Sequence, residues 1–137
     1  MIHDAGGAAD APPCRGGERG AAVVDFVMVG GLLTVFFLAI IQLTLILHVR
    51  NTLIDAASSG ARYGTLADRT ASDAEERAVM LIGTALTPDF AQDVSTAEVT
   101  FEGFKTLEVK VRAPLPVIGF IGPQDMLEVT GHAAIQP

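Results

Sequence analysis

The chain has 137 residues, with 16 acidic and 9 basic side chains, and its formal net charge is −7. This acidic balance argues against a partner that is a nucleic acid, and the length allows one modest domain. The single cysteine, Cys14, excludes a disulfide within the chain.

An almost uninterrupted apolar run follows Gly20. The 27 residues from Ala21 to Leu47 would form a helix about 40 Å long, whereas the hydrocarbon core of a bilayer is about 30 Å thick. We therefore predict a transmembrane helix over residues 21–47. A secretory signal has an apolar region of only about 7–15 residues, so the length favours retention, and cleavage near Ala56 is the alternative.

Residues 1–20 are rich in Ala, Gly, Pro and Asp and have no apolar periodicity. They are typical of a disordered targeting leader. Arg15 and Arg19 lie just before the span and favour a cytoplasmic N-terminus. Residues 48–137 would then form an extracytoplasmic domain.

Asp25 is the only charged residue in the span, and a carboxylate costs about 2.5–3.5 kcal/mol at the centre of a membrane helix. Cleavage between Gly20 and Ala21 would create an ammonium one helical turn away, where the two charges would attract each other within or between subunits. The alternative is an interfacial carboxylate that the N-terminal end of the helix dipole favours.

These residues resemble a known family. A short leader ending in Gly20, a small apolar residue at Ala21, an acid and an aromatic at Asp25 and Phe26, and then an apolar helix are similar to the class III signal sequence of type IV pilins. The likeness is greatest to the TadE-like pseudopilins of tight-adherence pili, which usually carry Glu at the position of Asp25. The stretch from Ala56 to Leu66 is similar to the small-residue segment that commonly follows the TadE-like helix.

The resemblance implies cleavage at Gly20–Ala21 by a prepilin peptidase and single-pass residence in the bacterial cytoplasmic membrane. It also implies that Asp25 and Phe26 serve assembly with other pilins or pseudopilins and with pilus platform proteins, in a minor pilin that assembles or primes a pilus for adhesion and biofilm formation. The alternative is a single-pass accessory or sensor module that never assembles. The mature N-terminus distinguishes the two.

Beyond Leu47, apolar residues continue at a spacing of three to four, which predicts that the helix extends into an amphipathic half. The positions are Leu53, Ile54, Ala57, Ala61 and Leu66. Gly60 and Gly64 form a GxxxG spacing where another backbone can approach closely. The partner is either a neighbouring subunit or the chain's own sheet, and we favour the sheet because Gly weakens a helix outside lipid.

A second helix is indicated by the capping-box pattern of Ser72 to Glu75, with Pro88 as its stop. Period-two alternation then predicts three strands, the first two joined by a hairpin at Gly103–Lys105. Their inward residues would be Val99 and Phe101; Leu107, Val109 and Val111; and Leu127, Val129, Ala133 and Ile135. The predicted fold is α+β and pilin-like, with a long helix packed on a small antiparallel sheet.

Other polar and apolar features leave alternatives open. Thr34, Gln42 and Thr44 bond either to neighbouring helices or to their own helix, and we favour the latter. The apolar segment Pro114–Pro123 contains too many prolines for a regular element, and we expect it to dock on the core rather than to form an exposed partner-binding or membrane-touching loop.

The sequence holds no recognisable catalytic or cofactor site. His3, His48 and His132 are too scattered to predict a metal site, and Ser58 and Ser59 lack an evident base. Glu75 and Glu76 are typical of a solvated first helical turn. We therefore expect no enzymatic activity, no metal and no cofactor.

Overall fold

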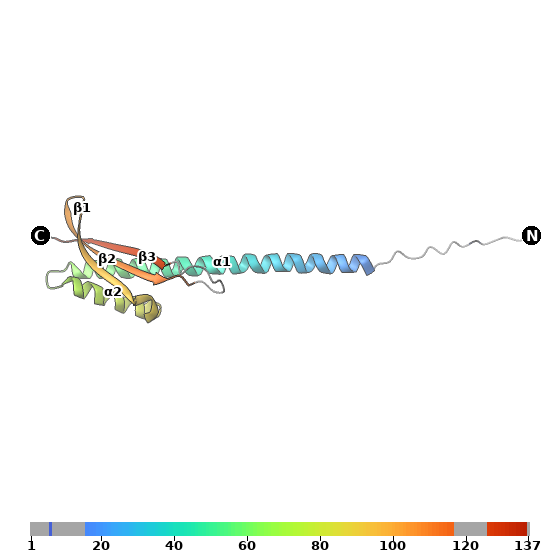
Figure 1. The fold of residues 1–137 in the computed structure, drawn as a ribbon, viewed down its shortest axis with the longest axis horizontal. Coiled ribbons are helices and arrows are strands. Elements are labelled where there is room, and N and C mark those ends of the chain that lie inside the picture. The colour runs from blue at the N-terminus through green and yellow to red at the C-terminus, as the bar shows by residue number, and fades with distance from the viewer. Residues whose placement is uncertain (1–5, 7–15, 117–125, 137) are drawn as a thin grey trace, which may run out of the picture. The chain divides into compact units, whose positions relative to one another are not determined.

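One long helix, α1 (Gly16–Gly64), begins the fold of this computed structural model, which describes residues 6, 16–116 and 126–136. The chain divides into two units, Met1–Ala39 and Ile40–Pro137, and α1 runs from the first into the second. The second unit also holds α2 (Ala71–Ala85), the short 3₁₀ helix η1 (Pro88–Ala91) and strands β1 (Asp93–Phe101), β2 (Phe104–Pro114) and β3 (Met126–Ala134). The predicted order of helices and strands is confirmed (Figure 1).

The bounds of α1 confirm that the apolar helix continues past Leu47, but both ends differ from expectation. The helix begins at Gly16, so the last five leader residues are helical rather than disordered. Glu18 lies in the first turn, where the helix dipole favours a negative charge. The helix ends at Gly64, and Leu66 lies beyond it with 56% of its surface exposed. The prediction that Leu66 belongs to the apolar face of this helix was therefore wrong.

The cap of α2 lies two residues earlier than predicted. Thr70 is the N-cap: its hydroxyl oxygen accepts from the Asp73 amide at 3.3 Å, and its own amide donates to the Asp73 carboxylate at 2.7 Å. Ser72 was wrongly predicted as the N-cap because the usual capping box has Glu or Gln at the third helical position. Here the shorter Asp73 occupies that position and completes the capping box with Thr70. The helix ends at Ala85, and Pro88 starts η1.

The three strands form one antiparallel sheet in the order β1-β2-β3. The predicted hairpin is confirmed, but its turn is Glu102–Gly103 rather than Gly103–Lys105, and the two turn residues have φ values of 51° and 85°. Both values are positive, as a two-residue turn that matches the strand twist requires.

The inward face of β1 was predicted wrongly, because the residues that face the helices are offset by one from Val99 and Phe101. Val99 pairs with Thr106 and Phe101 pairs with Phe104, so both lie on the face opposite the buried aliphatic residues of β2. Phe101 is accordingly 59% exposed. The helix-facing side of β1 instead carries the less apolar set Val94, Thr96 and Glu98.

A single core joins α1, α2 and the sheet within the second unit. Its buried residues are Val49, Leu53, Ala56, Ala57, Ala61, Ala74, Ala78, Ile82, Leu107, Val109, Val111, Ala113 and Val129. Six of these are alanines, so the helices and the sheet can pack at short distances. Complete burial of each larger aliphatic side chain contributes about 1.5–3 kcal/mol relative to exposure.

Candidate functional site

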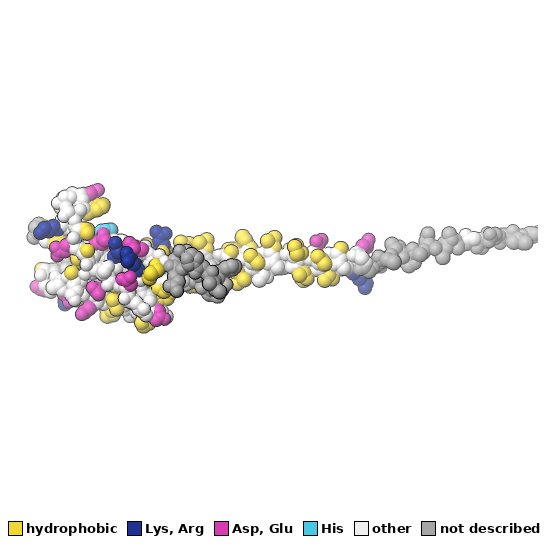
Figure 2. All heavy atoms as spheres, viewed as in Figure 1, with side chains coloured by type: hydrophobic (Ala, Val, Ile, Leu, Met, Phe, Trp, Pro, Cys, Tyr) yellow, Lys and Arg dark blue, Asp and Glu magenta, His cyan; other side chains and the backbone are white. Residues whose placement is uncertain are grey.

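The N-terminal part of α1 exposes apolar side chains on all sides. Phe26 is 79% exposed, and the most apolar 18-residue window has a mean hydropathy of 2.5 with none of it buried. Figure 2 shows hydrophobic side chains along this helix with few charges among them. Among the described residues, α1 is the one helix long and apolar enough to cross a membrane, and it is a candidate membrane anchor.

The predicted processing and assembly residues all lie on this exposed helix. Gly20, Ala21, Asp25 and Phe26 fall within the first ten or so residues of α1, and each is exposed. Asp25 follows Ala21 by four residues, which in a helix places the two one turn apart on the same side. No cation of the described part of the chain lies within ion-pair distance of the Asp25 carboxylate.

The polar residues of the apolar run behave in two ways. Thr34 and Thr44 donate to the carbonyls of Gly30 and Ile40, each at 2.8 Å, which confirms the expected bonds within the helix. Gln42 differs from the expectation. Its Nε2 donates at 2.6 Å to the carbonyl of Pro116, just after β2. Most of the segment Pro114–Pro123 lies outside the described residues, so its predicted docking stays a prediction.

Gly60 and Gly64 lie where α2 packs closely against α1. A Cβ added at Gly60 would stand 2.7 Å from the carbonyl oxygen of Ala74 and 3.0 Å from the Cβ of Ala78. At Gly64 it would meet the Cβ of Ala74 at 2.5 Å and a methyl of Leu107 at 2.7 Å. The main neighbour of this pair is therefore α2, and the sheet, which we had favoured, meets only Gly64.

Gly131 in β3 is a further close-packed position, which the sequence analysis did not single out. An added Cβ would collide with the backbone carbon of Ala57 and the backbone nitrogen of Ser58 in α1. The available signal was a lone glycine on the inward side of a predicted strand, which often marks a close backbone approach.

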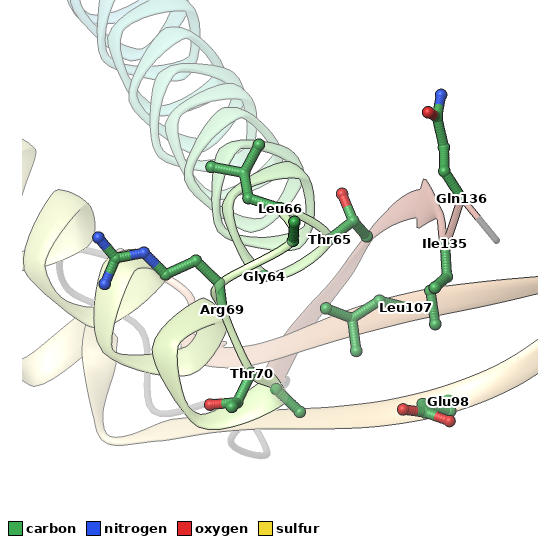
Figure 3. A pocket seen from close by; sticks show the side chains of 11 residues that line it. Gly64, Thr65, Leu66, Arg69, Thr70, Glu98, Leu107, Ile135 and Gln136 are labelled. Atoms are coloured by element: carbon green, nitrogen blue, oxygen red, sulfur yellow. The ribbon is translucent and has the colours of Figure 1, made fainter.

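A pocket of about 250 Å³ opens between the end of α1, the start of α2 and the sheet (Figure 3). It is lined by Gly64, Thr65, Leu66, Ala67, Arg69, Thr70, Ala71, Glu98, Leu107, Ile135 and Gln136. Leu107 and Ile135 form an apolar side, and Glu98 is the one lining carboxylate. Arg69 points away from them, and its guanidinium stacks 4.8 Å from the centre of the Tyr63 ring. These lining residues offer no nucleophile paired with a base.

The outer face of the sheet carries a chain of hydrogen bonds and ion pairs. His132 bonds to Glu108 at 2.9 Å, Lys110 lies 3.8 Å from Glu108 and 3.5 Å from Glu128, and Arg112 bonds to Glu128 at 2.8 Å. The hydrogen bond from Arg112 holds the pKa of Glu128 below its ordinary value and raises the pKa of Arg112. Exposed pairs of this kind add little to stability.

Potential metal ligands do not gather in the described part of the chain. No three His, Cys, Asp or Glu side chains there converge on a common point. His3 and Cys14 lie outside the described residues.

Comparison with known proteins finds a family match within the long helix. Residues 20–62 match the family described as TadE-like protein, which confirms the resemblance inferred from Gly20, Ala21 and Asp25. The match begins at Gly20 and ends within α1, so it covers the candidate anchor and the first part of the core. No curated protein and no solved structure matches the chain.

Proposed function

We propose that this TadE-like chain is a minor pilin or pseudopilin, anchored in the bacterial cytoplasmic membrane, that assembles or primes a tight-adherence pilus for adhesion and biofilm formation. One observation carries the proposal. The segment that matches the family begins with an apolar helical stretch, residues 21–39, whose side chains are exposed and whose single charge is Asp25. Lipid, and later the helices of neighbouring pilins, are the partners such a surface fits.

Processing is the first step of the proposed function. A prepilin peptidase cuts between Gly20 and Ala21 at the cytoplasmic face, and the domain beyond the anchor lies outside the cytoplasm. The scissile bond lies in the helix, so the peptidase needs local unwinding. Gly16, Gly17 and Gly20 ease it, because each glycine disfavours a helix by about 1 kcal/mol relative to Ala.

Assembly is the second step. The new ammonium at Ala21 pairs with Asp25 of a neighbouring subunit, and Phe26 packs beside that pair. Other pilins and the platform proteins of the pilus are the partners of this step. The role is structural, and it requires no catalysis, cofactor or metal.

The mature N-terminus tests the proposal. Mass spectrometry of the chain isolated from membranes should find Ala21 at the N-terminus of the wild type. Gly20→Val should accumulate precursor, because a branched side chain replaces the small residue before the cut.

Gly17→Val is the matched control, since Gly17 is also an exposed glycine of the first turn with open space around its Cβ position. It should still be cut at Ala21. A wild-type chain that keeps its leader in cells with an active prepilin peptidase would instead favour a single-pass accessory or sensor module.

A further inference from the structure

The apolar run of α1 is longer than a bilayer requires. Its 27 residues from Ala21 to Leu47 would extend about 40 Å, against about 30 Å of hydrocarbon. The 19 residues from Ala21 to Ala39 extend about 28 Å, close to that thickness, and helices of about 17–25 residues cross a bilayer. The first unit of the chain ends at Ala39, which leaves Ile40–Leu47 in the second unit.

The second unit covers one side of this remaining apolar stretch. Gln42, Leu45 and Ile46 are half-buried and Val49 is buried, and their spacing of three to four residues places them on one helix face. Val49 belongs to the core, and Leu45 packs against it. The opposite side of the same turns stays open: Ile41, Leu43 and Leu47 are 58%, 59% and 47% exposed.

The hydrogen bond of Gln42 locates the end of the sheet beside this stretch. The side-chain amide of Gln42 donates to the carbonyl of Pro116 at 2.6 Å. This hydrogen bond pairs the amide and the carbonyl with each other beside an apolar stretch of helix. An unpaired amide in hydrocarbon would be unfavourable. Pro116 follows the end of β2, where Pro114 pairs with Met126 of β3. Met126 is an apolar residue that is 56% exposed.

We propose that Ile41, Leu43, Leu47 and Met126 form an interfacial collar, by which this end of the second unit rests in the headgroup layer of the lipid bilayer. The proposal builds on the membrane anchoring proposed above. Chain continuity identifies the lipid bilayer as the partner of this surface. The collar begins two residues after residues 21–39, which are long enough to span the hydrocarbon. Exposed His48 and Arg50 follow directly, and such residues suit the polar side of the interface.

Depth-dependent fluorescence quenching tests the collar in the full chain. In a Cys14→Ser background, single cysteines from Met126→Cys, Leu43→Cys, Phe36→Cys and Phe104→Cys carry an environment-sensitive dye, and the protein is reconstituted in phosphatidylcholine vesicles. All four side chains are exposed, so labelling should not disturb the core. Phe36 reports on the anchor, and Phe104 at the hairpin is the aqueous control.

Lipids with a quencher near the headgroup should quench positions 43 and 126, lipids with a deep quencher should quench position 36, and a water-soluble quencher should reach position 104. Pro114→Cys, opposite Met126 in the register, provides an independent second reporter of the sheet end. The proposed collar would be refuted if only the water-soluble quencher reached positions 114 and 126 while the deep lipid quencher still reached position 36. Water access at position 36 would instead refute the membrane anchoring on which it rests.

Discussion

At the scale of single residues, the close packing of the helices and the sheet depends on a few glycines at which a side chain would collide with a neighbouring element. Gly131 is the most constrained, because an added Cβ would collide with main-chain atoms of Ala57 and Ser58 and would stand 2.7 Å from the Ala57 carbonyl oxygen. Backbone atoms inside a helix cannot yield as the end of a flexible side chain can.

Gly131→Ala should therefore lower the free energy of unfolding of the second unit by about 3 kcal/mol, the upper end of ordinary overpacking costs. Tyr63 is the only tyrosine in a chain without tryptophan, so its fluorescence during urea unfolding in detergent micelles follows this unit.

Gly83→Ala is the matched control for this prediction. Gly83 lies in α2 with no other atom near its Cβ position, and alanine there should raise stability by about 0.5–1 kcal/mol through helix propensity. Equal unfolding midpoints for Gly131→Ala and the wild type would show that β3 does not pack against α1 as described.

The glycines also show how far sequence reasoning reaches at this scale. The spacing of Gly60 and Gly64 is visible in the sequence, and so is its meaning as a smooth helix face. What packs there is not visible, because the match to Ala74 and Ala78 depends on how α2 folds back on α1. Gly131 depends in the same way on a contact between segments more than 70 residues apart.

At the scale of elements, helices were easier to predict than strand faces. The apolar run and its amphipathic continuation define α1 over many turns, so small errors at its ends change little. In β1, a shift of one residue exchanges the two faces, and the aromatic Phe101 was a misleading guide because it lies at the exposed hairpin end. The hairpin itself was predicted correctly from Gly103, although its turn is Glu102–Gly103 rather than Gly103–Lys105.

The N-terminal cap of α2 makes a prediction that depends on pH. The amide of Thr70 and then its hydroxyl donate to the Asp73 carboxylate and hold the pKa of Asp73 below its ordinary value of 3.8. The folded state thus binds this proton more weakly than the unfolded state. The stabilisation is complete above about pH 4 and is lost as the pH falls through the lowered pKa.

Thr70→Ala should cost about 1 kcal/mol of unfolding free energy at neutral pH, the usual loss for an N-cap, and this difference should shrink in acid. Urea unfolding at several pH values, followed by Tyr63 fluorescence, measures it. Thr84→Ala is the control, since the hydroxyl of Thr84 bonds only to the Met80 carbonyl within α2. A pH-independent effect of Thr70→Ala would argue against the reciprocal cap.

At the scale of the whole molecule, the two units differ in what they contribute to the fold. The residues before Ile40 supply an apolar helix, and those after it supply a small core of one sheet and two helices. Asp25 belongs to the first unit. In the orientation proposed above, Asp25 lies near the cytoplasmic end of the membrane helix, where water still reaches its carboxylate, so losing the charge should ease insertion rather than hinder it. Among packed helices the surroundings are drier, and a lower dielectric strengthens attraction to the ammonium of a neighbour's Ala21.

Asp25→Ala should therefore leave membrane levels of the chain near normal and reduce crosslinking to the major pilin of the same membranes about tenfold, which corresponds to about 1.4 kcal/mol. Asp25→Glu should retain partner recovery, because it keeps the charge and lengthens the reach by one methylene. Asp55→Ala removes an exposed carboxylate from α1 beyond the apolar run and should change nothing. Unchanged crosslinking of Asp25→Ala at normal expression would leave Asp25 as an interfacial carboxylate that only the helix dipole favours.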